Sequence, residues 1–259
     1  MRSEESARKW CTGVGTEIGA FQSPIPGIRP IYVDKFQEYA NEPTNAQYYG
    51  DVADLPFESE SLDYVATSHV LEHTANPVKA LVEWHRVLKP GGVAYMVVPD
   101  KRYTFDSPRS VTSVEHMIED YLAEVDDTDP THIDDFVFGV DWAEFSPGDK
   151  EEDWETRKKE LADAYRKATA SNNIINIHFH VFLEESLLEL VETINEDNRI
   201  PIRWTIEASE NRFPKETPNG ILLVLRKPGR PSFFHSFRKF LIKLRSSDYP
   251  VLSGARRFE

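Results

Sequence analysis

The chain has 259 residues and a formal net charge of −14, from 30 Lys and Arg against 44 Asp and Glu. Hydrophobic residues make up 40% of it, and a chain of this length buries roughly 70–75% of its unfolded surface without needing a disulfide or metal. The single cysteine, Cys11, excludes an internal disulfide framework and any zinc site built from several thiolates. Because the negative charge repels phosphate backbones, we expect no nucleic-acid partner.

Neither a membrane-spanning run nor a secretion signal is visible in the sequence. No segment approaches the roughly 18–20 consecutive apolar residues that a spanning helix needs. The opening MRSEESARKW lacks the apolar centre of a signal peptide. These features predict a cytoplasmic protein.

Short β-rich segments alternate with helical patterns over the first half of the chain, which is typical of a parallel sheet covered by helices. The clearest helix has Asn76 as its expected N-cap, Pro77 as its first residue, and Pro90-Gly91-Gly92 as its stop signal. It lies between the last two of five expected strands. We expect these strands at residues 15–18, 30–33, 46–49, 62–67 and 93–98.

A long, acidic and mostly helical stretch interrupts this rhythm from residue 101 to about residue 173, and we interpret it as an insertion. Apolar residues at helical spacing predict an amphipathic helix over residues 114–125 and a weaker one over residues 154–168. Residues 177–182 then alternate in a period of two, which predicts a half-buried strand.

The last part of the pattern limits the fold. A helix is expected over residues 184–195, followed by two strands at residues 202–208 and 220–226. No crossover helix separates these two strands, so they should pair antiparallel. Five strands joined by crossovers and then a hairpin predict a mostly parallel α/β sheet.

The first expected strand ends in a motif that suits close approach of a ligand. Glu17 lies two positions before Gly19, and a glycine there lets a ligand come near the backbone. The dinucleotide-binding fingerprint would need glycine at the positions of Phe21 and Pro24. The motif therefore favours a ligand without a pyrophosphate.

Acidic residues also follow the second and third expected strands. Asp34 can accept hydrogen bonds from both hydroxyls of a ribose. Asp51 and the backbone amide of Val52 match the edge of an adenine, because a carboxylate accepts from the exocyclic amine and an amide donates to the ring. Either acid alone could be an ordinary loop residue, but two at consecutive strand ends favour an adenosine site.

Four phrases carry a family resemblance: DVADLPF at residues 51–57, SHVLEH at 68–73, EWHRVLKPGG at 83–92 and VVPD at 97–100. From about residue 15 to 99 the chain resembles class I S-adenosylmethionine-dependent methyltransferases of the small-molecule, methyltransferase type 11-like group. The resemblance implies an enzyme with S-adenosylmethionine as cofactor. It also implies a Rossmann-like, doubly wound sheet of seven strands, mostly parallel with an antiparallel C-terminal hairpin strand, and a helical insertion after strand 5.

The resemblance assigns cofactor contacts to positions of this sequence. Glu17 and Gly19 would lie at the methionine moiety, Asp34 at the ribose, Asp51 and Val52 at the adenine, and Ser68 and His69 beside the sulfonium. The chain departs from the family at residues 20–26, where prolines replace the glycine-rich turn and much of the first helix. Glu72 and His73 are interpreted as loop-ordering residues, and Arg86 as the partner of a nearby acid.

The methyl acceptor, a small molecule or a glycan unit, should bind where the chain leaves the fifth strand, since ligands of open α/β sheets bind outside the carboxyl ends of the strands. We therefore predict acceptor contacts from Asp100, Arg102 and Asp106, and from His132 in the insertion. The insertion would close over the acceptor as a lid.

His178 and His180 are the predicted catalytic residues. Two apart on an expected strand, both would face the same side as Asn176. Neutral imidazole can take the proton of a hydroxyl acceptor, which favours O-methylation, for example of a sugar. Two alternatives stay open: the pair hydrogen-bonds the lid to the domain, or it binds a divalent metal with His132 or Asp106, although our predicted site contains no metal.

Residues 228–259 form a basic tail after the methyltransferase domain of residues 1–227. Seven Lys and Arg against two acidic residues give the tail a net charge of +5, which leaves −19 for the rest. Apolar residues between Phe233 and Leu244 predict an amphipathic cationic helix. Such a helix suits peripheral contact with an anionic membrane, and a lipid-linked glycan would then be a candidate acceptor. Alternatively, the helix packs on the acidic body of the protein or on a second subunit.

Three functions compete at this point. The leading one is methyl transfer from S-adenosylmethionine. A nicotinamide-dependent oxidoreductase could use Asp34 equally well, but Phe21, Pro24 and the phrase at residues 51–57 count against it. A cofactor-binding module without catalysis would share every motif, because in-line methyl transfer needs no fixed nucleophile.

Overall fold

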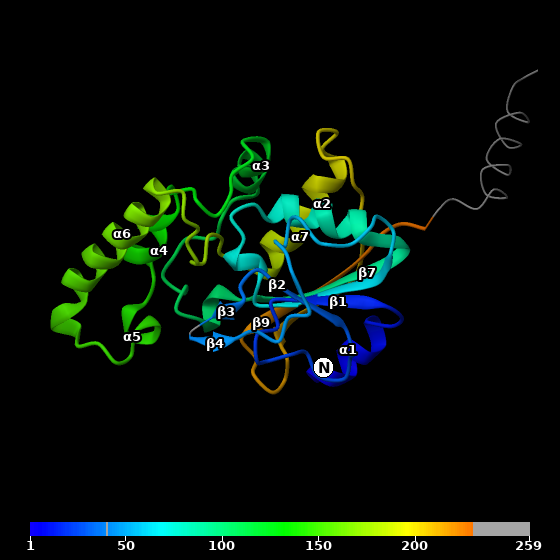
Figure 1. Ribbon diagram of the computed structural model, residues 1–259, viewed down its shortest axis with the longest axis horizontal. Helices are drawn as coiled ribbons and strands as arrows, with labels where there is room; N and C mark the ends of the chain where they lie inside the picture. Colours follow the sequence, from blue (N-terminus) through cyan, green and yellow to red (C-terminus); the bar gives the residue numbers. More distant parts are fainter. Residues whose placement is uncertain (40, 230–259) are drawn as a thin grey trace, which may run out of the picture. The chain divides into compact units, whose positions relative to one another are not determined.

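The computed structural model describes residues 1–39 and 41–229, and the expected tail helix lies outside this part of the chain. A seven-stranded sheet with the order β5-β2-β1-β6-β7-β9-β8 forms its centre (Figure 1). Neighbours are parallel from β5 to β7, and β9 is antiparallel to both β7 and β8. The strands are β1 (Gly15–Ile18), β2 (Ile31–Asp34), β5 (Tyr48–Tyr49), β6 (Leu62–Ser68), β7 (Leu88–Pro99), β8 (Thr205–Phe213) and β9 (Gly220–Arg226).

This arrangement confirms the predicted fold class. A separate two-stranded ribbon of β3 (Glu38–Tyr39) and β4 (Glu42–Pro43), which the sequence pattern did not indicate, follows β2. The α-helices are α1 (Ser3–Trp10), α2 (Pro77–Val87), α3 (Val114–Leu122), α4 (Ile133–Gly139), α5 (Trp142–Phe145), α6 (Trp154–Ala170) and α7 (Glu184–Glu196). Short 3-10 helices are η1 (Leu71–His73), η2 (Lys101–Tyr103) and η3 (Glu151–Asp153).

Helix α2 begins as its sequence predicts. The side chain of Asn76 accepts a hydrogen bond from the backbone N–H of Lys79 at 2.9 Å, and Pro77 occupies the first turn, where its missing N–H costs nothing. The helix ends one residue earlier than its apolar pattern suggests. Leu88 instead opens β7, so the Pro90-Gly91-Gly92 phrase belongs to the start of a strand.

The two faces of the sheet carry two hydrophobic clusters, as the alternation along β7 shows. Ala94, Met96 and Val98 belong to the cluster that includes α2 and α7, whereas Tyr95 and Val97 belong to the cluster that includes α1. Helices α2 and α7 lie over one face of the sheet in Figure 1, and α1 lies on the other. Both faces of the central strands are therefore buried, as in a doubly wound sheet.

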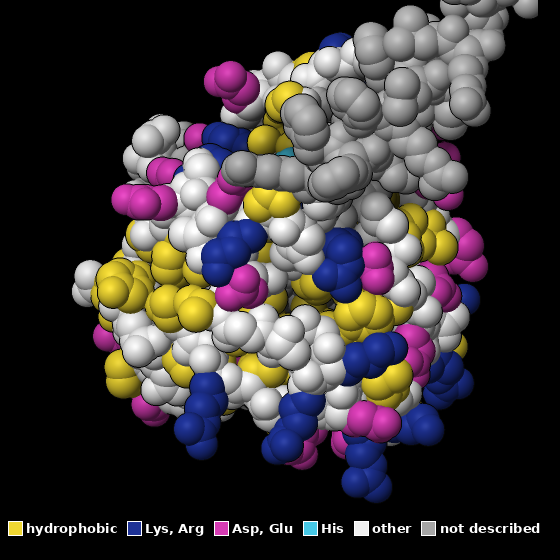
Figure 2. All heavy atoms as spheres, turned by 90° about the vertical axis from the view of Figure 1, so that its right-hand side faces the viewer, with side chains coloured by type: hydrophobic (Ala, Val, Ile, Leu, Met, Phe, Trp, Pro, Cys, Tyr) yellow, Lys and Arg dark blue, Asp and Glu magenta, His cyan; other side chains and the backbone are white. Residues whose placement is uncertain are grey.

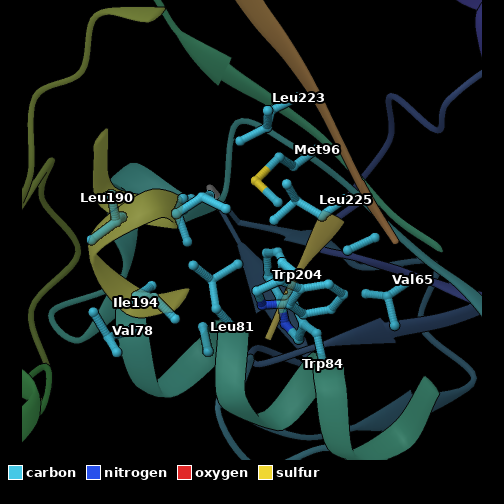
Figure 3. Packing of buried hydrophobic residues seen from close by; sticks show 14 of the residues in the cluster. Val65, Val78, Leu81, Trp84, Met96, Leu190, Ile194, Trp204, Leu223 and Leu225 are labelled. Atoms are coloured by element: carbon cyan, nitrogen blue, oxygen red, sulfur yellow. The ribbon is translucent and has the colours of Figure 1, made fainter. Parts of the chain in front are cut away.

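The larger cluster fixes α2 against the sheet. Figure 3 shows Trp84 pointing from α2 toward the strands, where Met96 and Leu225 lie, and Val78 beside Ile194 of α7. Trp84 is fully buried among them. This packing sets the position of α2, whose side chains hydrogen-bond the loop of residues 52–57.

The prediction of a strand over residues 177–182 is wrong. The segment has no regular secondary structure and pairs with no strand among residues 1–39 and 41–229, and all six of its residues are buried. Its apolar residues Ile177 and Phe179 join a third hydrophobic cluster with residues of α4, α5 and α6. The alternation of apolar and histidine residues therefore belongs to a segment that is buried on every side and not to a half-exposed strand.

Helices α3 to α6 account for the helical insertion after the fifth strand of the sheet, β7, and α4, α5 and α6 lie together at one side of the sheet (Figure 1). On the face seen in Figure 2, basic and acidic side chains lie interspersed with hydrophobic ones. No helix within residues 1–39 and 41–229 combines the length and apolar character needed to cross a bilayer.

Candidate functional site

A cavity of about 170 Å³ opens at the carboxyl ends of β1, β2 and β5. Five of the seven predicted cofactor residues line it: Gly19, Asp34, Asp51, Val52 and His69. The other two, Glu17 and Ser68, do not line this cavity. The structure thus brings the two acids expected at the ribose and the adenine to one hollow.

Gly19 forms the floor of the cavity and has a backbone conformation that favours glycine. Its φ is +69°, and a Cβ atom at this position would lie 2.6 Å from Cγ2 of Val70. Its N–H donates to the carbonyl of Val33 at 2.9 Å. A side chain here would clash with Val70 as well as block a ligand.

Asp34 ends β2 with its side chain almost fully buried, at 8% exposure. Oδ1 accepts a hydrogen bond from the backbone N–H of Phe36 at 3.0 Å. Burial raises the pKa of this carboxyl, although hydrogen bonds from the backbones of Phe36, Lys35 and Phe21 lower it. The carboxylate is therefore held in a fixed position at the cavity wall, as a ribose-binding acid must be.

Asp51 is tied to the insertion through a lysine. Its Oδ2 lies 2.8 Å from Lys35 Nζ, and the same ammonium group pairs with Asp127. Asp127 also accepts a hydrogen bond from the N–H of Ala75 at 3.1 Å and lines the cavity. Sequence reasoning missed both Lys35 and Asp127: Lys35 directly follows Asp34, but nothing distinguishes Asp127 among the acidic residues of the insertion.

Helix α2 anchors the loop of residues 52–57, which contains the expected adenine contact Val52, with three side chains. Trp84 Nε1 donates to the carbonyl of Val52 at 3.0 Å, and Glu83 accepts from the N–H of Leu55 at 2.8 Å. Arg86 donates to the carbonyl of Phe57 at 2.9 Å and pairs with Glu83. The expected pairing of Arg86 with a nearby acid is thus confirmed, and the DVADLPF and EWHR phrases are physically one unit.

Glu17 lies under the loop of residues 20–26 rather than in the cavity. Its Oε1 accepts the N–H of Ile25 at 2.8 Å, and its Oε2 is buried without a partner among the described residues. Burial raises the pKa of this carboxyl to about 7, although the hydrogen bond from Ile25 lowers it. Glu17 therefore fastens the segment that stands in place of a glycine-rich turn and first helix, and its contact with the methionine moiety stays a prediction.

The wild type should lose stability as the pH rises, because Glu17 becomes charged in a buried place, and replacing Glu17 with glutamine should remove this loss. A carboxyl whose pKa rises from 4.5 in the unfolded chain to about 7 in the folded protein contributes stability below pH 4.5 and loses it as the pH rises to 7. Relative to the variant, the wild type should lose about 2–3 kcal/mol of unfolding free energy between pH 5 and pH 8. Urea unfolding at both pH values measures this, and parallel curves for the two proteins would contradict it.

Two histidines of the cavity lining lie beside a buried carboxyl. His69 and His73 line the cavity, and Glu72 Oε1 lies 3.7 Å from His69 Nδ1 and 3.9 Å from His73 Nε2. Burial raises the pKa of Glu72 well above its ordinary value. The Glu72 carbonyl accepts the N–H of Phe179 at 2.7 Å, so this turn holds the segment that carries His178.

His178 is oriented by a buried carboxylate. Its Nδ1 lies 2.6 Å from Asp106 Oδ2, and Arg109 holds the other oxygen of Asp106 at 2.7 Å. Burial alone would raise the pKa of Asp106, but the hydrogen bonds and charges of His178 and Arg109 bring it below its ordinary value. The His178 ring packs edge-on against His73, with ring centroids 4.5 Å apart.

His180 does not share the face of His178, which corrects the expectation for this pair. Its Nε2 lies 3.0 Å from the carbonyl oxygen of Ala75, and its ring faces His132 at a centroid distance of 5.0 Å. The side chain has no exposed surface. Because the segment is not a pleated strand, a spacing of two does not place both imidazoles on one side.

The predicted acceptor residues lie outside the cavity lining. Asp100 is fully buried, accepts from the backbone N–H of Arg102 at the start of η2, and pairs with its guanidinium at 2.6 Å. Asp106 orients His178, and His132 lies beside His180. A direct contact of these residues with an acceptor stays a prediction.

Part of the chain is similar to known methyltransferases. A family model described as a methyltransferase domain matches residues 28–96. A 37.1 kDa protein in transposon Tn4556 of Streptomyces fradiae is 38% identical over 117 residues, which cover 41% of this chain and 34% of that protein. Demethylmenaquinone methyltransferase of Staphylococcus epidermidis is 47% identical over 45 residues, which cover 17% of this chain and 19% of the enzyme.

The chain thus spans about a third of the first of these relatives and about a fifth of the second. Among solved structures, a S-adenosylmethionine-dependent methyltransferase of Methanosarcina mazei covers 89% of this chain and all of its own, with 14% identity and a TM-score of 0.47. The matched segment contains Asp34, Asp51 and His69 of the cavity. The match of residues 28–96 to a methyltransferase domain supports the predicted class I S-adenosylmethionine-dependent methyltransferase, and the sheet ends in the antiparallel hairpin expected of it.

Proposed function

We propose that this chain methylates a hydroxyl group of a small molecule or a glycan unit, with His178 as general base. The observation that carries the proposal is the pairing of His178 Nδ1 with Asp106 Oδ2 at 2.6 Å, in a ring that packs edge-on against the cavity residue His73. An imidazole oriented by a buried carboxylate suits removal of a hydroxyl proton. An already neutral amine acceptor would need no such pair.

The cavity has the features that an S-adenosyl group requires. Gly19 lets the backbone line the cavity at a place where a Cβ atom would clash with Val70. Asp34 presents a fixed carboxylate for ribose hydroxyls, and Asp51 stands beside the backbone amide of Val52 for the adenine edge. The aromatic rings of Phe21 and Tyr39, 5.3 Å apart in an edge-on contact, give the cavity an apolar wall.

The residues of the chain would perform three tasks in the reaction. Bound S-adenosylmethionine supplies an electrophilic methyl group on a positively charged sulfur. Asp106 accepts from Nδ1–H of His178 and thereby leaves the Nε2 lone pair free to take the acceptor's proton. Lys35, between Asp51 and Asp127, holds the insertion against the adenosine cavity and so helps exclude water.

Formation of S-adenosylhomocysteine tests the activity directly. The full chain should release it in the presence of S-adenosylmethionine and a panel of sugars, phenols and a lipid-linked glycan, and matched amino compounds separate O- from N-methylation. Calorimetry with S-adenosylmethionine and with NAD tests the cofactor independently. Binding without turnover on any acceptor would instead indicate a module that has lost catalysis.

Replacing Asp34 with alanine should weaken the affinity for S-adenosylmethionine by about 1–3 kcal/mol, or roughly 5- to 150-fold in Kd, because polar partners are left unpaired in a buried place. Calorimetry on the folded variant measures the change. Glu58→Ala is the matched control, since it removes an exposed carboxylate outside the cavity. An unchanged Kd for Asp34→Ala would refute the ribose role.

A further inference from the structure

We propose that His116, His132 and His180, together with the carboxylate of Asp120, form a zinc site that staples the helical insertion. One ring nitrogen of each histidine lies within 4.8 Å of those of the other two. Asp120 Oδ2 lies 3.5 Å from His116 Nε2 and 3.7 Å from His132 Nε2. These groups lie apart from the lining of the adenosine cavity.

The hydrogen bonds around the cluster leave several of its acceptor atoms without a partner. A carbonyl oxygen can only accept, so His180 Nε2 donates to Ala75 and its Nδ1 carries a lone pair. His180 Nδ1, His132 Nε2 and Asp120 Oδ2 are all buried and have no hydrogen-bond partner among the described residues. Burying three acceptors without partners costs free energy, and a cation bound between them would offset that cost.

Two of the three histidines make the kind of outer hydrogen bond that is typical of metal-bound histidines. A ligating imidazole usually donates its other N–H to a backbone carbonyl or a carboxylate, which fixes the tautomer. His180 makes such a bond to Ala75, and His132 hydrogen-bonds the backbone of Phe179. Both rings are therefore oriented by contacts outside the cluster.

The donor set and its spacing favour zinc. Imidazole nitrogens with one carboxylate oxygen are typical zinc ligands, and tetrahedral bonds of about 2.0–2.2 Å place neighbouring donors about 3.3–3.6 Å apart. The distances from Asp120 Oδ2 to His116 and His132 come close to this without a large movement. His116 is half exposed and lines a surface hollow with His132 and Thr131, which gives an ion a way in.

Such an ion would connect three segments that are distant in sequence. His116 and Asp120 lie on α3, His132 stands at the start of α4, and His180 belongs to the buried segment before α7. The connection between α3 and α4 also carries Asp127, which lines the adenosine cavity. A zinc ion here would therefore hold the insertion in the position that closes the cavity.

Metal analysis of the full, tag-free chain tests the proposal without any assay of methyl transfer. After chelation and zinc titration, the wild type should bind one zinc ion per chain, and Co²⁺ in its place should give the visible absorption of a tetrahedral site. Saturating zinc should raise Tm by about 5–10 °C. His116→Gln should weaken zinc binding by at least about 100-fold, because even the indirect partners of a metal ligand are worth 10- to 100-fold.

Two controls separate this site from other histidines. His85→Gln removes an imidazole that packs on Trp204 outside the cluster, and it should keep the zinc. Glu72→Gln disables a second grouping of Glu72, His73 and His178, and it should also keep the zinc. Because His116 is half exposed, His116→Gln should fold as judged by circular dichroism. A wild type that binds no zinc, or binding lost in Glu72→Gln but kept in His116→Gln, would overturn the proposal.

Discussion

Replacing His178 with glutamine should lower kcat for a hydroxyl acceptor by about 10²- to 10⁴-fold, the usual contribution of a positioned general base. Glutamine can still hydrogen-bond Asp106, so the buried Asp106–Arg109 pair keeps a partner and the fold is preserved. The Kd of S-adenosylmethionine should not change, because His178 is not among the residues that line the adenosine cavity. Steady-state kinetics with calorimetry on the same preparation separates the two effects.

The controls for His178 distinguish a base from a structural residue. His85→Gln removes a histidine packed on Trp204 and should leave kcat unchanged. Asp106→Asn should lower kcat in the same direction, because an amide no longer fixes the Nδ1–H tautomer. If His178→Gln retains full kcat while its cofactor affinity is normal, His178 is not the base and the preference for hydroxyl acceptors loses its support.

The cavity that Asp34 and Asp51 line could be predicted because its determinants are local in sequence. Asp34 and Asp51 each follow a strand directly, and parallel strands bring their carboxyl ends to one edge of the sheet. The Asn76 cap and Pro77 likewise set the start of α2 within a few residues. In each case, a short stretch of chain and a general rule of packing were sufficient.

The contacts of His178 and Lys35 could not be predicted in the same way, because they join residues far apart in the chain. His178 meets Asp106 across 72 positions, and Lys35 meets Asp127 across 92. Alternation of apolar and histidine residues is shared by a half-exposed strand and by a segment buried on all sides. Only the third hydrophobic cluster of the insertion distinguishes them, and it assembles from four separate segments, among them α4 and α6.

Replacing Trp84 with alanine should lower the free energy of unfolding by about 3–5 kcal/mol, because the residue is fully buried in the larger core cluster and leaves a cavity under the sheet. Figure 3 shows its ring between α2 and the strands. Trp10→Ala, a change of equal size at a partly buried residue of α1, should cost less. Urea unfolding of the two variants gives the comparison.

Trp84→Phe separates the ring from the hydrogen bond that links the core to the cofactor site. Phenylalanine keeps most of the buried area but cannot donate to the carbonyl of Val52, which Trp84 Nε1 holds at 3.0 Å. Its cost in stability should be about 1–3 kcal/mol, and its Kd for S-adenosylmethionine should rise several-fold because the loop of residues 52–57 loses one of its anchors to α2. A variant with reduced stability but an unchanged Kd would show that Glu83 and Arg86 suffice to place the loop.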